Sequence, residues 1–314
     1  SSLRPAVWAG RVRVGAVNSQ RRQVAVTIHP LRPAAIEAAA EFITGINAKG
    51  IACLAFAEDF APLAARVPGA DLRELDGEDG SSCELVVVFG GDGNILRAAE
   101  WALPRRVPVL GVNLGHVGFL AELESSQVPT LIEHVARGDY EVEERMTIEV
   151  SVRAERGGEE LWRSFAINEI SVEKLARERM IEVLVRIDDR PLSRWATDGV
   201  LVATPTGSTA YAFSAHGPVI WPDLSALLLV PLSAHALFAR PLVLGEQTVV
   251  SIEMLPGGSP GGVVWCDGRR TTDVTGGMEI VATVGQHRLR LARTSVQPFV
   301  NRLVRKFGLP VDGW

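Results

Sequence analysis

The sequence is poor in cysteine, and it has no long apolar run. Its three cysteines, Cys53, Cys83 and Cys266, lie far apart and form no CxxC pair. This spacing argues against a disulfide framework and against a thiolate zinc site. No stretch of about 18 apolar residues occurs, so we expect no membrane-spanning helix. Together these absences favour a protein of the reducing cytoplasm, without a membrane partner.

Motifs of several well-known enzyme classes are also absent. The chain has no GxxxxGK[ST] phosphate loop, no GxGxxG after its first predicted strand, and neither GxSxG nor HExxH. Its 32 basic and 37 acidic residues give a net charge of −5, which argues against a general polyanion-binding surface. P-loop kinases, Rossmann dehydrogenases and nucleic-acid-binding proteins are therefore poor first hypotheses.

The first half of the chain is predicted to be an α/β domain, over residues 23–139. A length of 314 residues allows one or two domains. Apolar runs typical of buried parallel strands alternate with helical segments, and a polar stretch rich in Gly and Asp separates the second strand from the third. We predict strands at 23–28, 51–56, 84–89 and 107–113, and helices at 33–49 and 94–103. This alternation indicates a Rossmann-like parallel sheet whose ligands gather at the carboxyl ends of its strands.

The second half has a different pattern. Residues 140–295 consist mainly of alternating and β-branched runs, which predict a β-rich domain. In the tail, residues 296–314, Phe299, Leu303 and Phe307 follow a helical spacing, so we expect a helix that packs back on the first domain. The basic residues 1–22 lack the apolar core of a signal peptide, and we predict a flexible arm there.

A glycine-rich segment, Phe89-Gly90-Gly91-Asp92-Gly93-Asn94, follows a predicted buried strand and precedes a helix. Glycines let main-chain amides approach an anion closely, and the helix start adds unpaired amides. This setting predicts a phosphate-binding turn. A carboxylate beside phosphates repels them unless it holds a metal ion or accepts a proton from an attacking hydroxyl. The alternative is a plain Asp-Gly turn.

Two polar segments of the second half are further candidates. Four hydroxyl side chains lie between Thr204 and Tyr211, directly after an apolar strand, and hydroxyls at this density suit ribose or phosphate oxygens. An N-capped helix start is the structural alternative for this segment. Asn168 and Glu169 offer a donor, an acceptor and a charge side by side, as recognition of sugar hydroxyls requires. A surface pair in a turn is the alternative for these two residues.

Taken together and in this order, GGDGN, GVNLGHVGFL, Asn168-Glu169, Asp198-Gly199, TPTGSTAY and VPLSAHALFARPLV resemble the NAD kinase family. The likeness runs from about residue 84 to the end of the chain. It implies an enzyme that transfers the terminal phosphate of ATP or polyphosphate to the 2′-hydroxyl of the adenosine ribose of NAD, giving NADP. It also implies a divalent cation such as Mg²⁺ carried with the phosphate donor, no protein ligand set for a metal, and a homodimer or homotetramer.

The resemblance also assigns roles to residues. Asp92 is expected to be the catalytic carboxylate. The other positions are expected to bind NAD or the donor nucleotide, and they are Gly91, Gly93, Arg97, Phe119, Asn168, Glu169, Arg179, Asp198, Thr206, Ser208, Thr209, Ala210, Tyr211, Ser214 and His235. Among these, the family's histidine at the position of His235 approaches the ligand from a neighbouring subunit.

Some positions depart from the family pattern. Asn94 stands where many members have Thr, Ala203 replaces a common Ser, Ala196 replaces a frequent Gly or Arg, and His216 replaces a common Gly. Two alternatives therefore stay open beside the NAD kinase hypothesis. One is a lipid or diacylglycerol-type kinase, which shares GGDG, and the other is a catalytically silent NAD(P)-binding regulator.

Overall fold

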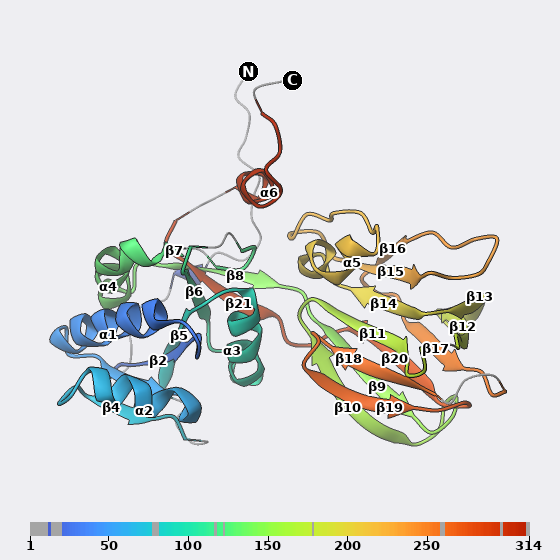
Figure 1. Cartoon of the computed structure of the whole chain (residues 1–314), viewed down its shortest axis with the longest axis horizontal. Helices are drawn as coiled ribbons and strands as arrows, with labels where there is room; N and C mark the ends of the chain where they lie inside the picture. The colour runs from blue at the N-terminus through green and yellow to red at the C-terminus, as the bar shows by residue number, and fades with distance from the viewer. Residues whose placement is uncertain are drawn as a thin grey trace. The chain divides into compact units, whose positions relative to one another are not determined.

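The structure is a computed structural model that describes residues 12–13, 21–76, 82–115, 118–121, 123–177, 179–257, 261–295 and 298–311. The chain divides into two compact units (Figure 1). Unit 1 consists of Ser1–Glu144 and Leu289–Trp314, and unit 2 of Arg145–Arg288.

Within the described residues, unit 1 is built on a nine-stranded sheet. The neighbouring strands from β21 to β4 all pair parallel, whereas β1 and β8 pair antiparallel. In spatial order the strands are β1 (Val12–Arg13), β8 (Glu141–Arg145), β21 (Leu289–Arg293), β6 (Val109–Asn113), β5 (Cys83–Phe89), β2 (Gln23–Ile28), β3 (Ala52–Ala55) and β4 (Leu72–Glu74), with β7 (Leu123–Glu124) paired with β6. The predicted parallel sheet is confirmed.

The helices of unit 1 are α1 (Pro33–Ala48), α2 (Ala57–Arg66), α3 (Asp92–Arg105), α4 (Val128–Arg137) and α6 (Phe299–Phe307), with a short 3₁₀ turn, η2, at Ser125–Gln127. Helix α1 begins at Pro33, as predicted, and Gly50 follows its end in the left-handed region (φ 79°). Helix α2 and strand β4 lie in the polar stretch for which no element was predicted. Helix α2 contains Pro62 and buries only Asp59 and Leu63, so its apolar periodicity is weak.

The core of unit 1 lies between its sheet and the pair α1 and α4, which lie side by side in Figure 1. Alternate residues of β2, Val24 and Val26, point into this core, and the Phe42 ring of α1 packs 5.8 Å from the Phe89 ring of β5. Helix α3 contacts β5 and β6. Strand β5 is therefore buried and held in place. This sets the position of the GGDG segment that follows β5.

Helix α6 packs on unit 1, as the spacing of its aromatic residues predicted. The rings of Phe299 and Phe307 lie 5.9 and 5.8 Å from the ring of Phe119, and Leu303 is buried. Arg302 of the same helix is also buried, with its Nη1 donating to the Phe119 carbonyl over 2.7 Å. The last helix thus contacts the loop that follows β6.

Unit 2 contains two six-stranded antiparallel sheets among its described residues, which confirms the predicted β-rich domain. The first sheet consists of β10 (Glu160–Ala166), β9 (Ile148–Arg153), β20 (Glu279–Val284), β17 (Val250–Met254), β12 (Ile181–Ile187) and β13 (Arg190–Thr197). The second consists of β16 (Leu242–Gly245), β15 (Ala226–Leu232), β14 (Gly199–Ala203), β11 (Glu169–Lys174), β18 (Gly262–Cys266) and β19 (Arg270–Val274). Side chains of both sheets form one core, with Trp195 fully buried in it.

The unit boundaries differ from the predicted domain limits of 140 and 295. Strands β8 and β21 belong to the sheet of unit 1, and Leu291 of β21 pairs with Val109 of β6. Alternation in HRLRLAR is compatible with either sheet, so only the pairing decides. Most of the predicted flexible arm lies outside the described residues, but Val12–Arg13 pairs with β8, and Arg22 forms a salt bridge with Glu84 at 2.6 Å.

Candidate active site

The GGDG segment of unit 1 has the predicted strand–glycine–helix geometry. Strand β5 ends at Phe89, Gly91 is the N-cap of α3, and Asp92 is its first residue. A Cβ on Gly90 would lie 2.5 Å from Asn94 Oδ1, so only glycine fits there. A Cβ on Gly91 or Gly93 would meet nothing within 4 Å among the described residues. The space beside these amides is open to a ligand, as a phosphate-binding helix start requires.

The carboxylate of Asp92 is held by three successive main-chain amides. Phe119 N donates to Oδ2 over 2.9 Å, and Leu120 N and Ala121 N donate to Oδ1 over 3.0 and 3.4 Å. A Cβ on Gly118 would lie 2.4 Å from Oδ1, so a glycine there lets the loop approach the carboxylate closely. Asp92 is half-buried. The loop after β6 therefore orients this carboxylate while leaving it partly accessible.

Two arginines from the end of the chain hold the same loop. Arg302 of α6 donates to the Phe119 carbonyl, and Nη1 of Arg293 of β21 donates to the Leu120 carbonyl over 2.9 Å. Phe119, which the family resemblance places at the nucleotide site, is buried with its ring against Phe299 and Phe307. His116 and Val117 of the GVNLGHVGFL motif lie outside the described residues.

Arg97 of α3, the second predicted contact to phosphate, lies in a polar network at the carboxyl end of β2. Its Nη2 donates to Asp59 Oδ2 over 2.9 Å and to the Ile28 carbonyl over 3.0 Å, and its Nη1 lies 3.2 Å from Glu58 Oε1. Asp59 is buried and also accepts from the Thr27 hydroxyl over 2.5 Å. Sequence reasoning missed Asp59 because α2 itself was not predicted.

In unit 2, the hydroxyl-rich segment forms the short helical turns η3 (Thr206–Thr209) and α5 (Tyr211–Ser214) after β14. The Thr204 hydroxyl donates to the Ile167 carbonyl over 2.6 Å and accepts from Gly207 N over 3.0 Å. The buried Ser208 hydroxyl donates to the Pro205 carbonyl over 2.6 Å and accepts from Ile220 N over 2.9 Å. These two hydroxyls stabilise the turn itself, but the N-caps of η3 and α5 are Pro205 and Ala210, which form no side-chain cap.

The tertiary structure brings this segment against Asn168 and Glu169. A Cβ on Gly207 would lie only 1.9 Å from the Asn168 carbonyl oxygen, and Thr204 N donates to that oxygen over 2.8 Å. Glu169 pairs with Ala203 across β11 and β14. Two predicted segments more than thirty residues apart are thus joined within unit 2, because β11 and β14 are neighbours in one sheet.

Glu169 is a buried acid. Burial, and then the negative charge of Asp267, raise the pKa of Glu169 to about 8, although the Tyr211 backbone amide donates to the carboxylate and lowers it. A carboxyl group with this pKa is mostly protonated at neutral pH, so Glu169 is able to donate a hydrogen bond to a ligand as well as to accept one.

The remaining predicted residues of unit 2 lie around this pair or on the surface. Burial raises the pKa of the half-exposed Tyr211 phenol, as do the charges of Glu173, Glu169 and Asp198, so these carboxylates lie near the ring. Asp198 forms an ion pair with Lys174 at 2.5 Å. Thr206 is buried, Thr209 and Ala210 are half-buried, and Arg179, Ser214 and His235 are exposed. The His235 amide donates to the Ala196 carbonyl over 2.8 Å.

Asp267 is a polar residue of this region that sequence reasoning missed. It is buried at the turn between β18 and β19, and its carboxylate accepts from the amides of Ile167, Asn168 and Glu169 over 2.9, 2.7 and 3.3 Å. Burial raises the pKa of Asp267, against the opposing effect of these amides. The Asp-Gly pair after the apolar strand β18 was a signal for a hairpin turn, but nothing in the sequence pointed to these partners.

Two further properties concern all the described residues. No group of three or more His, Cys, Asp or Glu side chains in those residues is arranged to hold a metal ion. Among the same residues, no helix is long and apolar enough to cross a membrane.

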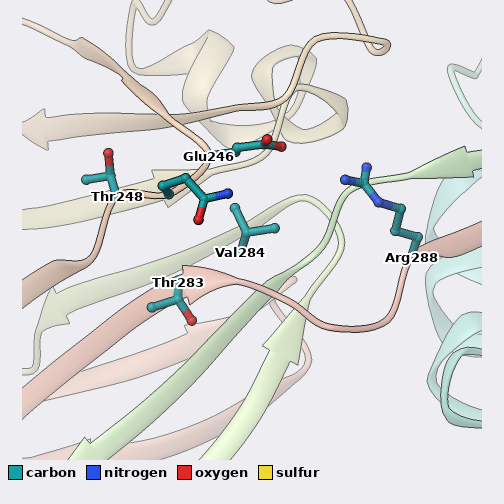
Figure 2. Close-up of a pocket in the computed structure, with 6 residues that line it drawn as sticks. Glu246, Thr248, Thr283, Val284 and Arg288 are labelled. Atoms are coloured by element: carbon teal, nitrogen blue, oxygen red, sulfur yellow. The ribbon is translucent and has the colours of Figure 1, made fainter. Parts of the chain in front are cut away.

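A pocket of about 400 Å³ lies elsewhere in unit 2, and no predicted site residue lines it (Figure 2). Its lining is polar and comes from the segments after β16 and around the end of β20, with Glu246, Gln247, Thr248, Thr283, Val284 and Arg288.

Comparisons with known proteins agree on one family. The model of the ATP-NAD kinase N-terminal domain matches residues 46–140, and that of the ATP-NAD kinase C-terminal domain matches residues 167–294. An NAD kinase from Cutibacterium acnes is 54% identical over 302 residues, covering 96% of this chain and 94% of that protein. An NAD kinase from Thermobifida fusca is 46% identical over 300 residues, covering 93% and 91%.

Solved structures of the same kind share the fold. Yeast NADH kinase complexed with NADH superposes with a TM-score of 0.82 at 23% identity, covering 93% of this chain and 89% of that one. An NAD kinase from Archaeoglobus fulgidus in complex with ATP gives a TM-score of 0.69 at 24% identity, covering 92% and 100%.

Proposed function

The chain belongs to the ATP-NAD kinase family, and from this premise we propose that it transfers the terminal phosphate of ATP or polyphosphate to the 2′-hydroxyl of the adenosine ribose of NAD, giving NADP. Two NAD kinases are 54% and 46% identical to this chain, and the likeness covers 94% and 91% of their length. Neither a lipid kinase nor a silent regulator finds support among them. The observation that carries the proposal is the oriented and partly accessible carboxylate of Asp92 beside an open helix start.

In the proposed reaction, Asp92 accepts the proton of the ribose 2′-hydroxyl while the hydroxyl oxygen attacks the terminal phosphorus. The bond from that phosphorus to the bridging oxygen breaks, and the donor leaves as ADP or a shortened polyphosphate. General-base assistance contributes about 10²–10⁴ in rate, so alignment and charge neutralisation supply the rest. The amides of the α3 first turn are proposed to bind the donor phosphates, since the first amides of a helix have no partner within the helix.

A divalent cation such as Mg²⁺ fits this chain as a companion of the donor phosphates, where it would neutralise charge on the transferring group. Mg²⁺ keeps several water ligands and is usually bound together with substrate phosphates. The chain has only three lysines, Lys49, Lys174 and Lys306, so its own cations near phosphate would be mainly arginines.

NAD is proposed to bind to unit 2, at Asn168, Glu169, Asp198 and the segment from Thr206 to Ser214. The close approach of Gly207 to the Asn168 carbonyl and the pairing of Glu169 with Ala203 support one joint site. Arg179 and His235 are proposed as further contacts to NAD, and Gly91, Gly93, Arg97 and Phe119 as parts of the donor side.

We further propose a cytoplasmic homodimer or homotetramer. All three cysteines are buried free thiols, as expected in a reducing compartment. Leu237 and Phe238 are exposed on the segment that carries His235, as a subunit contact would require. Analytical ultracentrifugation of the wild type and of a Leu237→Asp, Phe238→Asp variant tests the assembly, because a monomeric wild type would contradict it.

The test of the proposed function is an assay of NADP formation by the purified chain, with NAD and either ATP or polyphosphate, with and without EDTA. We expect NADP with at least one donor and none with EDTA. A diacylglycerol acceptor in place of NAD should give no phosphorylated lipid. A melting shift with NAD but no NADP from either donor would instead identify a silent regulator.

A further inference from the structure

A second buried carboxylate, outside the assigned residues, lies at the base of the proposed NAD site. Asp267 and Gly268 begin the three-residue connection between β18 and β19, with φ values of 53° and 63°. Both left-handed residues fit an Asp-Gly turn of the kind that joins hairpin strands. The Asp267 amide donates to the Glu169 carbonyl over 3.0 Å, so the turn is hydrogen-bonded to the first residue of β11.

The Asp267 side chain holds the main chain of residues 167–169. Its oxygens accept from three successive amides, the shortest of which is that of Asn168 at 2.7 Å, and the side chain is only 1% exposed. Hydrogen bonds to an ionised acceptor are roughly twice as strong as neutral ones. Three such bonds to consecutive amides leave this short segment little freedom to rotate.

Arg270 fixes the carboxylate in turn. Its Nη2 donates to Asp267 Oδ2 over 3.1 Å, and its Nη1 donates to the Ser164 hydroxyl and the Phe165 carbonyl over 2.9 and 2.6 Å. The guanidinium lies 4.0 Å from the centre of the Phe165 ring. Through Asp267 and Arg270, the hairpin turn therefore forms hydrogen bonds along the segment from Ser164 to Glu169.

The main-chain carbonyls of the same segment accept hydrogen bonds from the hydroxyl-rich segment. The Thr204 hydroxyl donates to the Ile167 carbonyl, and the Thr204 amide donates to the Asn168 carbonyl. The peptide groups around Asn168 are thus held at their carbonyls by Thr204 and at their amides by Asp267. The side chains of Asn168 and Glu169 can still change rotamer, but these hydrogen bonds fix the main chain from which they extend.

We propose that Asp267 is a positioning residue for NAD, which acts by fixing the main chain under Asn168 and Glu169. This inference rests on the proposed function, since it assumes that those two side chains bind NAD. Asp267 does not need to contact the ligand. Its effect is on affinity for NAD, whereas the phosphate donor and the chemical step depend on other residues.

The variant that tests this is Asp267→Asn, which keeps the shape but loses the charge and places an NH₂ group where amides now donate. The matched control is Asp273→Asn, the same change at an exposed position of β19 in the same hairpin. In the full-length protein, the dissociation constant for NAD is measured by isothermal titration, and kcat and KM by NADP formation. Hydrogen exchange reports the amides of residues 167–169.

For Asp267→Asn we expect the NAD dissociation constant and KM to rise about tenfold or more, with kcat and the KM for ATP changed less than about threefold. Exchange at 167–169 should accelerate, and Asp273→Asn should match the wild type. A folded Asp267→Asn protein whose NAD affinity lies within twofold of wild type would overturn the proposal.

Should Asp267→Asn not fold, Arg270→Lys serves in its place, because it keeps the positive charge but loses the planar fork. Its NAD dissociation constant should rise by about threefold to tenfold, with kcat preserved, and an unchanged constant would overturn the proposal. A wild-type protein that neither binds NAD nor forms NADP would instead refute the proposed function, so the two failures are distinguishable.

Discussion

In each unit one aspartate carboxylate is held by three successive main-chain amides, and the two carboxylates differ in how accessible they remain. In unit 1, Asp92 accepts from the amides of residues 119–121, and in unit 2, Asp267 accepts from the amides of residues 167–169. Three successive amides form a concave donor surface that suits an anion. Both carboxylates are therefore oriented by main chain that lies far away in the sequence.

The difference lies in what remains available on each carboxylate. A carboxylate offers about four acceptor positions. Among the described residues, Asp92 Oδ2 accepts from one amide only and its residue is half-buried, so a substrate hydroxyl has room to approach. Asp267 is 1% exposed and has Arg270 as a further partner. We propose that the same arrangement prepares Asp92 for chemistry and commits Asp267 to holding the main chain of residues 167–169.

The largest expected effect is that of Asp92→Asn, which keeps the hydrogen-bonded shape and removes the basicity. We expect kcat to fall at least about 10²-fold, with the NAD dissociation constant unchanged, because general-base assistance contributes that much. Asp139→Asn, an exposed position of unit 1, is the control. Turnover above about a tenth of wild type would remove Asp92 from the base role and with it the contrast to Asp267.

Arg302→Gln comes next, because it loosens the amides that orient Asp92 without touching Asp92 itself. Arg302 is buried and donates to the Phe119 carbonyl. We expect kcat to fall about tenfold, since small misplacements of a reacting group are costly, with an unchanged NAD dissociation constant. Arg305→Gln, whose ion pair with Glu124 is exposed, should keep full activity. Equal kcat values in the two variants would contradict the orienting role of α6.

A pH titration of stability sharpens the comparison with a third carboxyl group, Glu169. Its pKa rises from the usual 4.5 to about 8 in the folded protein, so the folded state binds more protons than the unfolded chain between these values. Stability from this group is fully present below pH 4.5 and is lost as the pH rises to 8. Between pH 5 and pH 9, the wild type should lose about 4 kcal/mol more than Glu169→Gln in urea unfolding. Parallel curves would show that Glu169 ionises normally.

The contribution of Tyr211 to binding is expected to be smaller and restricted to NAD affinity. The residue is 39% exposed, so its ring is available to border a base. Tyr211→Ala should weaken NAD binding about tenfold while changing kcat less than threefold, and Tyr211→Phe should keep most of the affinity. Unchanged NAD affinity in Tyr211→Ala, measured by titration, would contradict a contact to the ligand.

The smallest effect concerns the backbone. Asp267 and His216 both have left-handed φ values, 53° and 62°, but hydrogen bonds offset the strain at Asp267, whereas His216 is exposed. His216→Gly should therefore stabilise the protein by about 1 kcal/mol in thermal unfolding. Ala215→Gly, at φ −89°, should instead destabilise it by about 0.5 kcal/mol. A destabilised His216→Gly protein would show that the imidazole makes a contact worth more than the strain.

Much of the fold and the order of the motifs could be read from the residues, because those signals are local. The buried run from Leu85 to Phe89, the proline at the start of α1 and the aromatic spacing of α6 each depend on neighbours within a few turns. Helix α2 escaped because Pro62 and its few buried residues blur the pattern. Strand β21 was predicted within the second domain, because its alternation fits either sheet, whereas it pairs with β6 in the sheet of unit 1.

The sequence by itself determined where glycines, acids and hydroxyls follow strands, and hence which family the chain resembles. Only the tertiary structure decided what holds Asp92 and what lies beneath Asn168 and Glu169. The physical reason is that both carboxylates are bound mainly by backbone amides, which every residue except proline carries and which leave no mark in the residue pattern. Helix packing and strand pairing bring these amides to their acids, across about thirty positions in unit 1 and a hundred in unit 2.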